Sequence, residues 1–116
     1  MARADAGTRA EALAADYLTG QGLTVVARNF RTRFGEIDLI ARDGDTLVFV
    51  EVRLRTSRSF GGAAASITAT KQARLVAAAR GYLAALGREP PCRFDAVLLD
   101  ALAPAQVRWE RDILSQ

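Results

Sequence analysis

The chain has 116 residues, half of them hydrophobic and a quarter charged, which excludes a disordered polypeptide and predicts a single domain over residues 1–116. It contains no histidine, which excludes Ser/His triads, Cys/His pairs and histidine-bound metal sites. The formal net charge of +3 is mildly basic and compatible with a polyanionic partner. Any chemistry must therefore use carboxylates, basic side chains or a metal held by oxygen ligands.

The sequence also gives expectations about the cellular compartment. No apolar run is long enough to cross a bilayer, so no membrane partner is expected. The N-terminus lacks a positively charged head followed by an uninterrupted apolar segment, so no signal peptide is expected. The single cysteine, Cys92, has no internal partner for a disulfide, which is typical of a reducing compartment. We therefore expect a cytoplasmic protein.

A helix is predicted near the N-terminus because apolar residues recur at helical spacing. These residues are Ala10, Leu13, Ala14, Tyr17 and Leu18. Thr8, followed three residues later by Glu11, predicts a capping box, which by itself would explain the presence of Glu11. The helix would end at Gly20 or Gly22, and residues 23–30 predict the first strand.

The segment GEIDLIARDGDTLVFVEVR, residues 35–53, predicts a β-hairpin because two apolar runs flank an Asp-Gly turn. With a two-residue turn at positions 43 and 44, Glu36 faces Glu51, Asp38 faces Phe49, and Ile37 faces Val50. Side chains alternate between the two faces of a strand. One face would carry Glu36, Asp38, Phe49, Glu51 and Arg53, and the other Ile37, Leu39, Val48, Val50 and Val52. A three-residue turn would instead put Asp38 and Glu51 on opposite faces.

The second half of the chain predicts a loop, a helix and one or two strands. Residues 55–66, RTSRSFGGAAAS, predict a mobile loop. A helix is predicted from about Thr68 to Leu86, and Lys71 and Gln72 continue its apolar stripe at the N-terminal end. CRFDAVLLD predicts a buried strand, and QVRWERDI a last edge strand. The order αβββαβ, with or without a final β, predicts an α/β fold in which two main helices flank a mixed sheet of four to five strands.

The carboxylates inside the hairpin need an explanation, because like charges facing each other across a sheet destabilise it. A hard divalent cation such as Mg²⁺ or Mn²⁺, held by Asp38 and Glu51, would neutralise them and activate a water against a phosphodiester. Arg53 lies on the same face and would hold phosphate oxygens. Alternatively, these are ordinary exposed acids on a solvent-facing strand, and Arg53 pairs with Glu51 or Glu36. The pattern alone leaves both explanations open.

Three segments together resemble a known family: GEIDLIARDGDTLVFVEVR, SITATKQARLVAAARGYL and RFDAVLLD. They resemble the YraN-like family of small bacterial proteins, which is placed in the PD-(D/E)XK nuclease superfamily and is similar in outline to archaeal Holliday-junction resolvases. The resemblance implies a restriction-endonuclease-like core and a metal-dependent, endonuclease-like activity on branched or structured DNA. Because resolvase-like relatives work as dimers, it also implies a homodimer.

The resemblance implies a role for individual residues. Asp38 and Glu51 match the two metal-binding acids, and Glu11 matches the helix glutamate that often completes the metal shell. Arg53 stands where the motif usually has lysine, so Lys71, from the second helix, is expected to supply the missing amine. Lys71 would otherwise be a solvated residue of a first helical turn.

Further residues are expected around the metal ligands. Glu36 and Gln72 are expected to contact the ligands rather than the metal. Four arginines are expected to form a basic rim for DNA phosphates, although scattered surface arginines give the same sequence pattern. They are Arg31, Arg33, Arg55 and Arg58.

Arg53 leaves the activity open, because lysine can lose its proton whereas arginine is bulkier and stays protonated. If the mechanism needs a base near the attacking water, Arg53 is a poor substitute; if it needs only charge stabilisation, Arg53 serves. The alternative function is therefore a nucleic-acid-binding module of the same fold that cleaves weakly or not at all. A third is a protein-interaction domain without a nucleic-acid ligand.

Overall fold

The structure, a computed structural model, describes residues 5–54 and 68–114. The elements along the chain are α1 (Ala6–Gly20), β1 (Thr24–Thr32), β2 (Gly35–Asp43), β3 (Thr46–Leu54), α2 (Ala69–Leu86), β4 (Cys92–Leu99), a 3₁₀ helix (Pro104–Gln106) and β5 (Val107–Glu110). The strands form one sheet in the order β1-β2-β3-β4-β5. Only β3 and β4 pair in parallel. The predicted α/β fold is confirmed with five strands, while the predicted loop at 55–66 lies outside the described residues.

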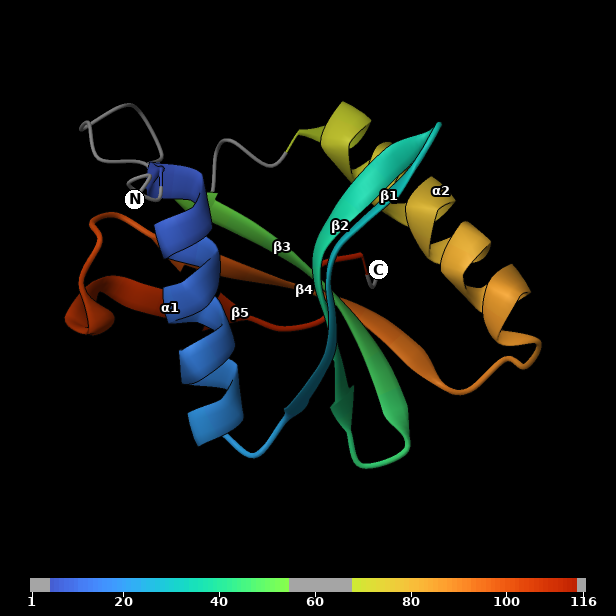
Figure 1. Cartoon of the computed structure of the whole chain (residues 1–116), viewed down its shortest axis with the longest axis horizontal. Coiled ribbons are helices and arrows are strands. Elements are labelled where there is room, and N and C mark those ends of the chain that lie inside the picture. The colour runs from blue at the N-terminus through green and yellow to red at the C-terminus, as the bar shows by residue number, and fades with distance from the viewer. Residues whose placement is uncertain (1–4, 55–67, 115–116) are drawn as a thin grey trace.

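The two helices cover opposite faces of the sheet and produce three layers (Figure 1). The core on the α1 face consists of Ala10, Ala14, Ala15, Leu18, Leu23, Leu39, Ala41, Val48, Val50, Val52, Val97 and Leu99. The core on the α2 face consists of Ile37, Ile40, Leu47, Phe49, Leu75, Ala78 and Ala79. Neither helix is long and apolar enough to span a membrane.

The ends of the helices correct one prediction and confirm another. Asp5 is the N-cap of α1, and its Oδ1 accepts a hydrogen bond of 2.7 Å from the N–H of Thr8. Thr8 therefore lies inside the first turn, and the predicted capping box with Glu11 is wrong. Glu11 lies in the second turn and needs another explanation. For α2, the predicted limits are confirmed: Thr68 is the N-cap, and the helix closes with Gly87 in the left-handed conformation at φ 78°.

The β2–β3 hairpin forms, but its register is shifted by two residues from the prediction. Gly44 and Asp45 form the turn, and Gly44, with φ 60°, takes the first central position, as in a type II′ turn. The predicted pairings of Glu36 with Glu51, Asp38 with Phe49 and Ile37 with Val50 are therefore wrong. A shift of two residues preserves the faces of the strand. It brings Asp38 level with Glu51 instead of Phe49.

The start of β2 changes face, which the sequence did not predict. Ile37 packs in the core on the α2 face and Leu39 in the core on the α1 face, although alternate residues of a regular strand share a face. Between them lies Asp38, and opposite it in β1 lies Asn29, whose φ is 52°. Asparagine tolerates positive φ better than most residues, and Asn29 marks an irregularity of β1 at the same level as the change of face in β2. The predicted single apolar surface containing both Ile37 and Leu39 is therefore wrong.

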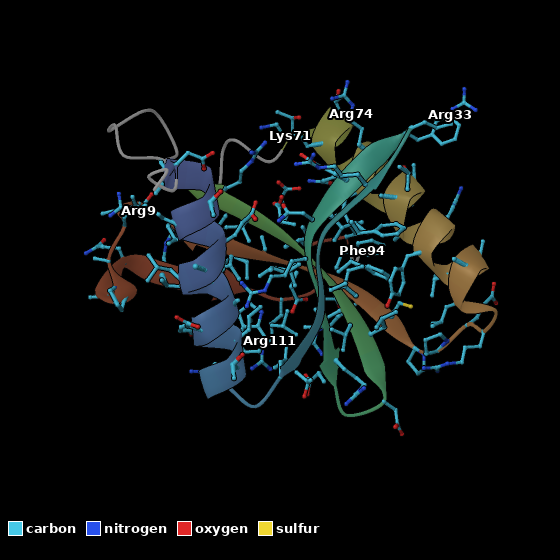
Figure 2. The ribbon with its side chains drawn as sticks, viewed as in Figure 1. Arg9, Arg33, Lys71, Arg74, Phe94 and Arg111 are labelled. Atoms are coloured by element: carbon cyan, nitrogen blue, oxygen red, sulfur yellow. The ribbon has the colours of Figure 1, made fainter. Side chains whose placement is uncertain are left out.

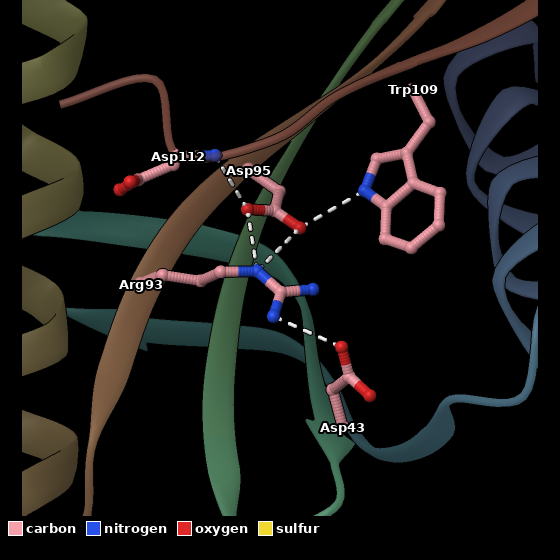
Figure 3. Close-up of polar contacts among 5 residues, drawn as sticks. All are labelled: Asp43, Arg93, Asp95, Trp109 and Asp112. Carbon is pink, nitrogen blue, oxygen red and sulfur yellow. Dashed lines mark hydrogen bonds and ion pairs between the residues drawn. The ribbon is translucent and has the colours of Figure 1, made fainter. Parts of the chain in front are cut away.

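A fully buried carboxylate fastens the C-terminal segment to β4 (Figure 3). Asp95 accepts hydrogen bonds from Trp109 Nε1 at 2.9 Å and from the N–H of Asp112 at 2.9 Å. Arg93 Nε donates to both of its oxygens, at 3.1 and 3.2 Å. Arg93 Nη1 also forms an ion pair with Asp43 at 2.9 Å. Asp95 thus has the partners that a buried carboxylate requires.

Candidate functional site

A cavity opens where β2 separates from β3. Their pairing ends at Leu39 and Val50, whereas the pairing of β1 with β2 continues to Thr32 and Gly35. The ribbon of β1 and β2 therefore bends away from β3 toward the start of α2 (Figure 1). The cavity has a volume of about 660 Å³ and is lined by Arg31, Thr32, Arg33, Phe34, Gly35, Glu36, Asp38, Glu51, Arg53, Lys71 and Arg74.

Asp38 and Glu51, called the acid pair below, bring two carboxyl groups together in this cavity. The N–H of Val52 donates a hydrogen bond of 2.8 Å to Asp38 Oδ2. This side-chain contact joins β2 to β3 beyond Leu39 and Val50, where the backbone pairing of the two strands ends. The two carboxyl groups are close enough to change each other's pKa values. The structure thus brings together the two acids that the sequence placed on one face.

Burial and mutual repulsion make full ionisation of the acid pair unfavourable. Burial raises the pKa of Asp38, and the hydrogen bond from Val52 partly opposes this effect. Burial, followed by the charge on Asp38, raises the pKa of Glu51 to about 8. At neutral pH Glu51 is therefore mostly protonated. An additional positive charge in the cavity would stabilise the ionised forms of both groups.

Arg53 supplies part of that positive charge. Its Nε lies 3.6 Å from Glu51 Oε1, which is an ion pair but too long for a hydrogen bond. This Nε is buried and has no hydrogen-bond partner within the part of the chain that the structure describes. Its charge lowers the pKa of both acids, although burial outweighs this effect. The guanidinium lies on the predicted face and lines the cavity.

The other two predicted acids lie beside the acid pair rather than within it. Glu11 is half-buried on α1, and the Asn29 side chain is close enough to lower its pKa. Burial, and then the charge on Asp38, raise its pKa, so it is an electrostatic neighbour of the acid pair, but it does not line the cavity. Glu36 lines the cavity, is exposed, and pairs with Arg31 Nε at 3.2 Å.

Residues 5–54 and 68–114 contain no group of three or more Asp, Glu, Cys or His side chains arranged to hold a metal ion. A metal at this position would therefore have the two carboxyl groups of the acid pair as protein ligands. Mg²⁺ commonly binds through one or two carboxylates and keeps several waters. Two converging carboxyl groups with raised pKa values, open to a cavity, fit such an ion.

Basic side chains surround the acid pair. Lys71 and Arg74 lie in the first turns of α2 and line the cavity together with Arg31 and Arg33. Figure 2 shows that Lys71, Arg74 and Arg33 project at the same end of the molecule. Arg74 was not predicted, although its spacing of three residues from Lys71 places both on one side of a helix.

Besides Glu11, one predicted residue within the described part of the chain does not line the cavity. Gln72 is half-buried in α2 and does not line the cavity. Arg55 and Arg58 lie outside the described residues. The sequence also missed Phe34 and Gly35, which line the cavity at the turn between β1 and β2. The sequence feature that could have indicated them is an isolated aromatic residue followed by glycine within a charged segment.

Comparison with known proteins places this geometry in a family. The family model described as "Uncharacterised protein family UPF0102" matches residues 10–99, which include the acid pair and every residue that lines the cavity. The chain belongs to the UPF0102 family. This confirms the predicted membership of the family described above as YraN-like.

Individual UPF0102 proteins match nearly the whole chain. One from Nitrosospira multiformis is 57% identical over 106 residues, covering 91% of this chain and 89% of the relative. One from Nitrosomonas europaea is 54% identical over 110 residues, covering 95% and 93%. One from Cupriavidus taiwanensis is 59% identical over 104 residues, covering 89% and 77%.

Proposed function

We propose that this UPF0102 protein is a Mg²⁺- or Mn²⁺-dependent endonuclease-like protein of the PD-(D/E)XK type that binds branched or structured DNA and hydrolyses its phosphodiester backbone. One observation carries the proposal. The carboxyl groups of Asp38 and Glu51 meet in an open cavity whose other charged side chains are mainly basic. The acids fit a cation and the surrounding bases fit a polyanion, and a phosphodiester bound to a metal needs both.

Each side chain then has a separate task. Asp38 and Glu51 hold the divalent cation, and Val52 fixes the orientation of Asp38. The bound ion supplies charge neutralisation and lowers the pKa of a coordinated water. Arg53 stays protonated and stabilises the negative charge on the phosphate while the bond to the leaving oxygen breaks. Lys71 and Arg74 bind neighbouring phosphates at the rim of the cavity.

A second candidate function is DNA binding without effective cleavage, and Arg53 favours it. Arginine does not act as a base, and the ion pair of Arg53 with Glu51 already supplies part of the positive charge that a metal would bring. This candidate predicts DNA affinity that falls steeply with salt and no cleavage with any metal. Arg53→Lys tests the difference, because it keeps the charge and restores a group that can lose its proton. A gain in cleavage would show that Arg53 limits the reaction.

The proposal is tested by cleavage of branched and linear DNA with Mg²⁺ or Mn²⁺. Asp38→Asn and Glu51→Gln should each reduce cleavage by about 100-fold or more, in line with loss of a group that stabilises the transition state. Glu89→Gln is the matched control, since Glu89 is exposed and follows the far end of the 18-residue helix α2, about 27 Å long.

The possible results separate the candidate functions. Cleavage by either acid-pair variant at the level of the control would rule out the metal-binding roles. DNA binding by the wild type without cleavage would support the second candidate. Absence of DNA binding even at low salt would overturn both and favour a protein-interaction domain.

A further inference from the structure

Phe34 exposes a large aromatic ring at the rim of the cavity. Among the described residues, three large hydrophobic side chains are exposed: Phe34 at 66%, Val26 at 40% and Leu86 at 37%. Single exposed hydrophobic residues are ordinary on protein surfaces and by themselves indicate nothing. Phe34 differs from the other two because it lines the cavity that contains the acid pair.

The turn that carries Phe34 is held in place from both sides. Thr32 Oγ1 accepts hydrogen bonds from the N–H groups of Phe34 and Gly35, both at 3.1 Å, and donates one of 3.0 Å to the carbonyl of Gly35. On the other side, Gly35 packs directly on α2, where an added Cβ would overlap the carbonyl of Arg74. The ring of Phe34 therefore stands on a turn that is anchored to the sheet and to α2.

Cationic groups surround this ring. The guanidinium of Arg33 lies 5.6 Å from the centre of the Phe34 ring, and Arg31, Lys71 and Arg74 line the same cavity. Arg33 projects from the tip of the β1–β2 ribbon, close to the α2 end that carries Arg74 (Figure 2). An apolar protein surface would remove these cations from water without supplying opposite charge, which is costly. A nucleotide fits both features, because its phosphate pairs with the cations and its base stacks on the ring.

We propose that Phe34 stacks on an unpaired base of the DNA while a neighbouring phosphate enters the cavity. In a continuous duplex, each base is already stacked on both sides, so the ring would gain a partner only after a costly unstacking step. The substrates are therefore DNA structures that present unpaired nucleotides, such as flaps, gaps and branch points. This inference rests on the proposed function and deepens it by naming the substrate class.

The test measures equilibrium binding to two DNAs of equal length: an oligonucleotide with an unpaired 2-aminopurine, and a blunt duplex. EDTA is present in both measurements so that metal-dependent cleavage is absent. Stacking of one base on an aromatic side chain is worth about 1–3 kcal/mol. Phe34→Ala should therefore weaken binding to the unpaired site about 5- to 140-fold and change duplex binding less than about twofold. Wild-type protein should quench the 2-aminopurine fluorescence, whereas Phe34→Ala should not.

Two further variants keep the interpretation specific. Phe34→Trp retains an aromatic ring and should restore both the affinity and the quenching. Leu86→Ala removes an exposed hydrophobic side chain at the opposite end of α2 and should behave as wild type.

The outcomes distinguish this inference from the proposed function. If wild type binds DNA but Phe34→Ala binds the unpaired site equally well, the stacking role is overturned and the nuclease proposal stands. If binding depends on Phe34 but no cleavage occurs with Mg²⁺ or Mn²⁺, the stacking role stands and the nuclease proposal fails. If wild type binds neither DNA, both are overturned.

Discussion

Carboxylates with little exposure to solvent occur at two places in this sheet, and their surroundings are opposite. Asp95 is completely buried and accepts hydrogen bonds from Trp109, Asp112 and Arg93 (Figure 3). In the acid pair, Asp38 has one backbone donor, from Val52, and Glu51 is 3.6 Å from the nearest cationic nitrogen of Arg53. Asp95 has its partners inside the protein, whereas the acid pair faces an open cavity.

The difference indicates which carboxylate is structural and which is available for a ligand. A buried polar group with a complete set of partners contributes to folding and offers nothing to a ligand. Two carboxyl groups that meet without enough donors keep raised pKa values and gain from a bound cation. Burial of an acid is therefore no sign of function by itself. An acid that lacks internal partners and also faces an opening to solvent is such a sign.

The largest expected effect is on stability, and it distinguishes Asp95 from the acid pair. Asp95→Asn places an amide NH₂ group next to the donors of Trp109, Asp112 and Arg93, so hydrogen bonds are lost. It also removes one of the two carboxylates that pair with Arg93. We expect the free energy of unfolding to fall by about 2–4 kcal/mol, measured by urea denaturation. Asp38→Asn should change it by less than about 1 kcal/mol, because the amide oxygen still accepts the hydrogen bond from Val52. Equal losses in the two variants would contradict the comparison.

Divalent cations should stabilise the protein only through the acid pair. At an ion concentration 100 times the dissociation constant, one site that exists only in the folded state adds about 2.7 kcal/mol to the free energy of unfolding. We expect Mg²⁺ or Mn²⁺ to raise the melting temperature of wild type and of the control Glu89→Gln. Asp38→Asn and Glu51→Gln should lose this response. A full response in these two variants would place the ion elsewhere.

The pH dependence of stability sharpens the comparison further. The pKa of Glu51 is about 8 in the folded protein, against an ordinary value of 4.5, so the folded state binds more protons between these pH values. Without divalent cations, this contribution is complete below about pH 4.5 and is lost as the pH rises to about 8. The slope is at most about 1.4 kcal/mol per pH unit. Urea denaturation in EDTA should show a flatter profile for Glu51→Gln, and identical profiles would refute the shift.

The smallest effect is expected for Glu36, the exposed acid of the cavity. Glu36 and Arg31 have exposed side chains, at 57% and 74%, and a surface ion pair of this kind is worth about 0.2–1 kcal/mol. Glu36→Gln should reduce the free energy of unfolding by no more than that and leave the response to Mn²⁺ intact. Loss of the metal response would show that Glu36 belongs to the metal site itself.

Local patterns in the sequence predicted the elements but not their junctions. The hairpin, both helices and the buried fourth strand follow from periodicity and turn residues, which are local signals. The register of β2 against β3 was wrong because Gly44 takes the first rather than the second position of the turn. Even so, Asp38 and Glu51 both line the cavity.

The rest of the site depends on contacts between distant segments. The change of face between Ile37 and Leu39 lies level with the positive φ of Asn29 in the neighbouring strand, and no periodic pattern reveals either feature. Asp95 looked like an ordinary residue of a buried strand, and its partner Trp109 lies far along the chain. Arg74 lines the cavity because α2 packs on Gly35, a contact that only the fold determines.

The claim that the acid pair binds a divalent cation is tested most directly by the anomalous scattering of a crystal soaked in Mn²⁺. The acid pair is the expected site, and Asp95 is the control. The account predicts one peak between Asp38 and Glu51, about 2.1 Å from an oxygen of each, and none at Asp95. An empty cavity with both acids in place, or an ion at Asp95 instead, would contradict it.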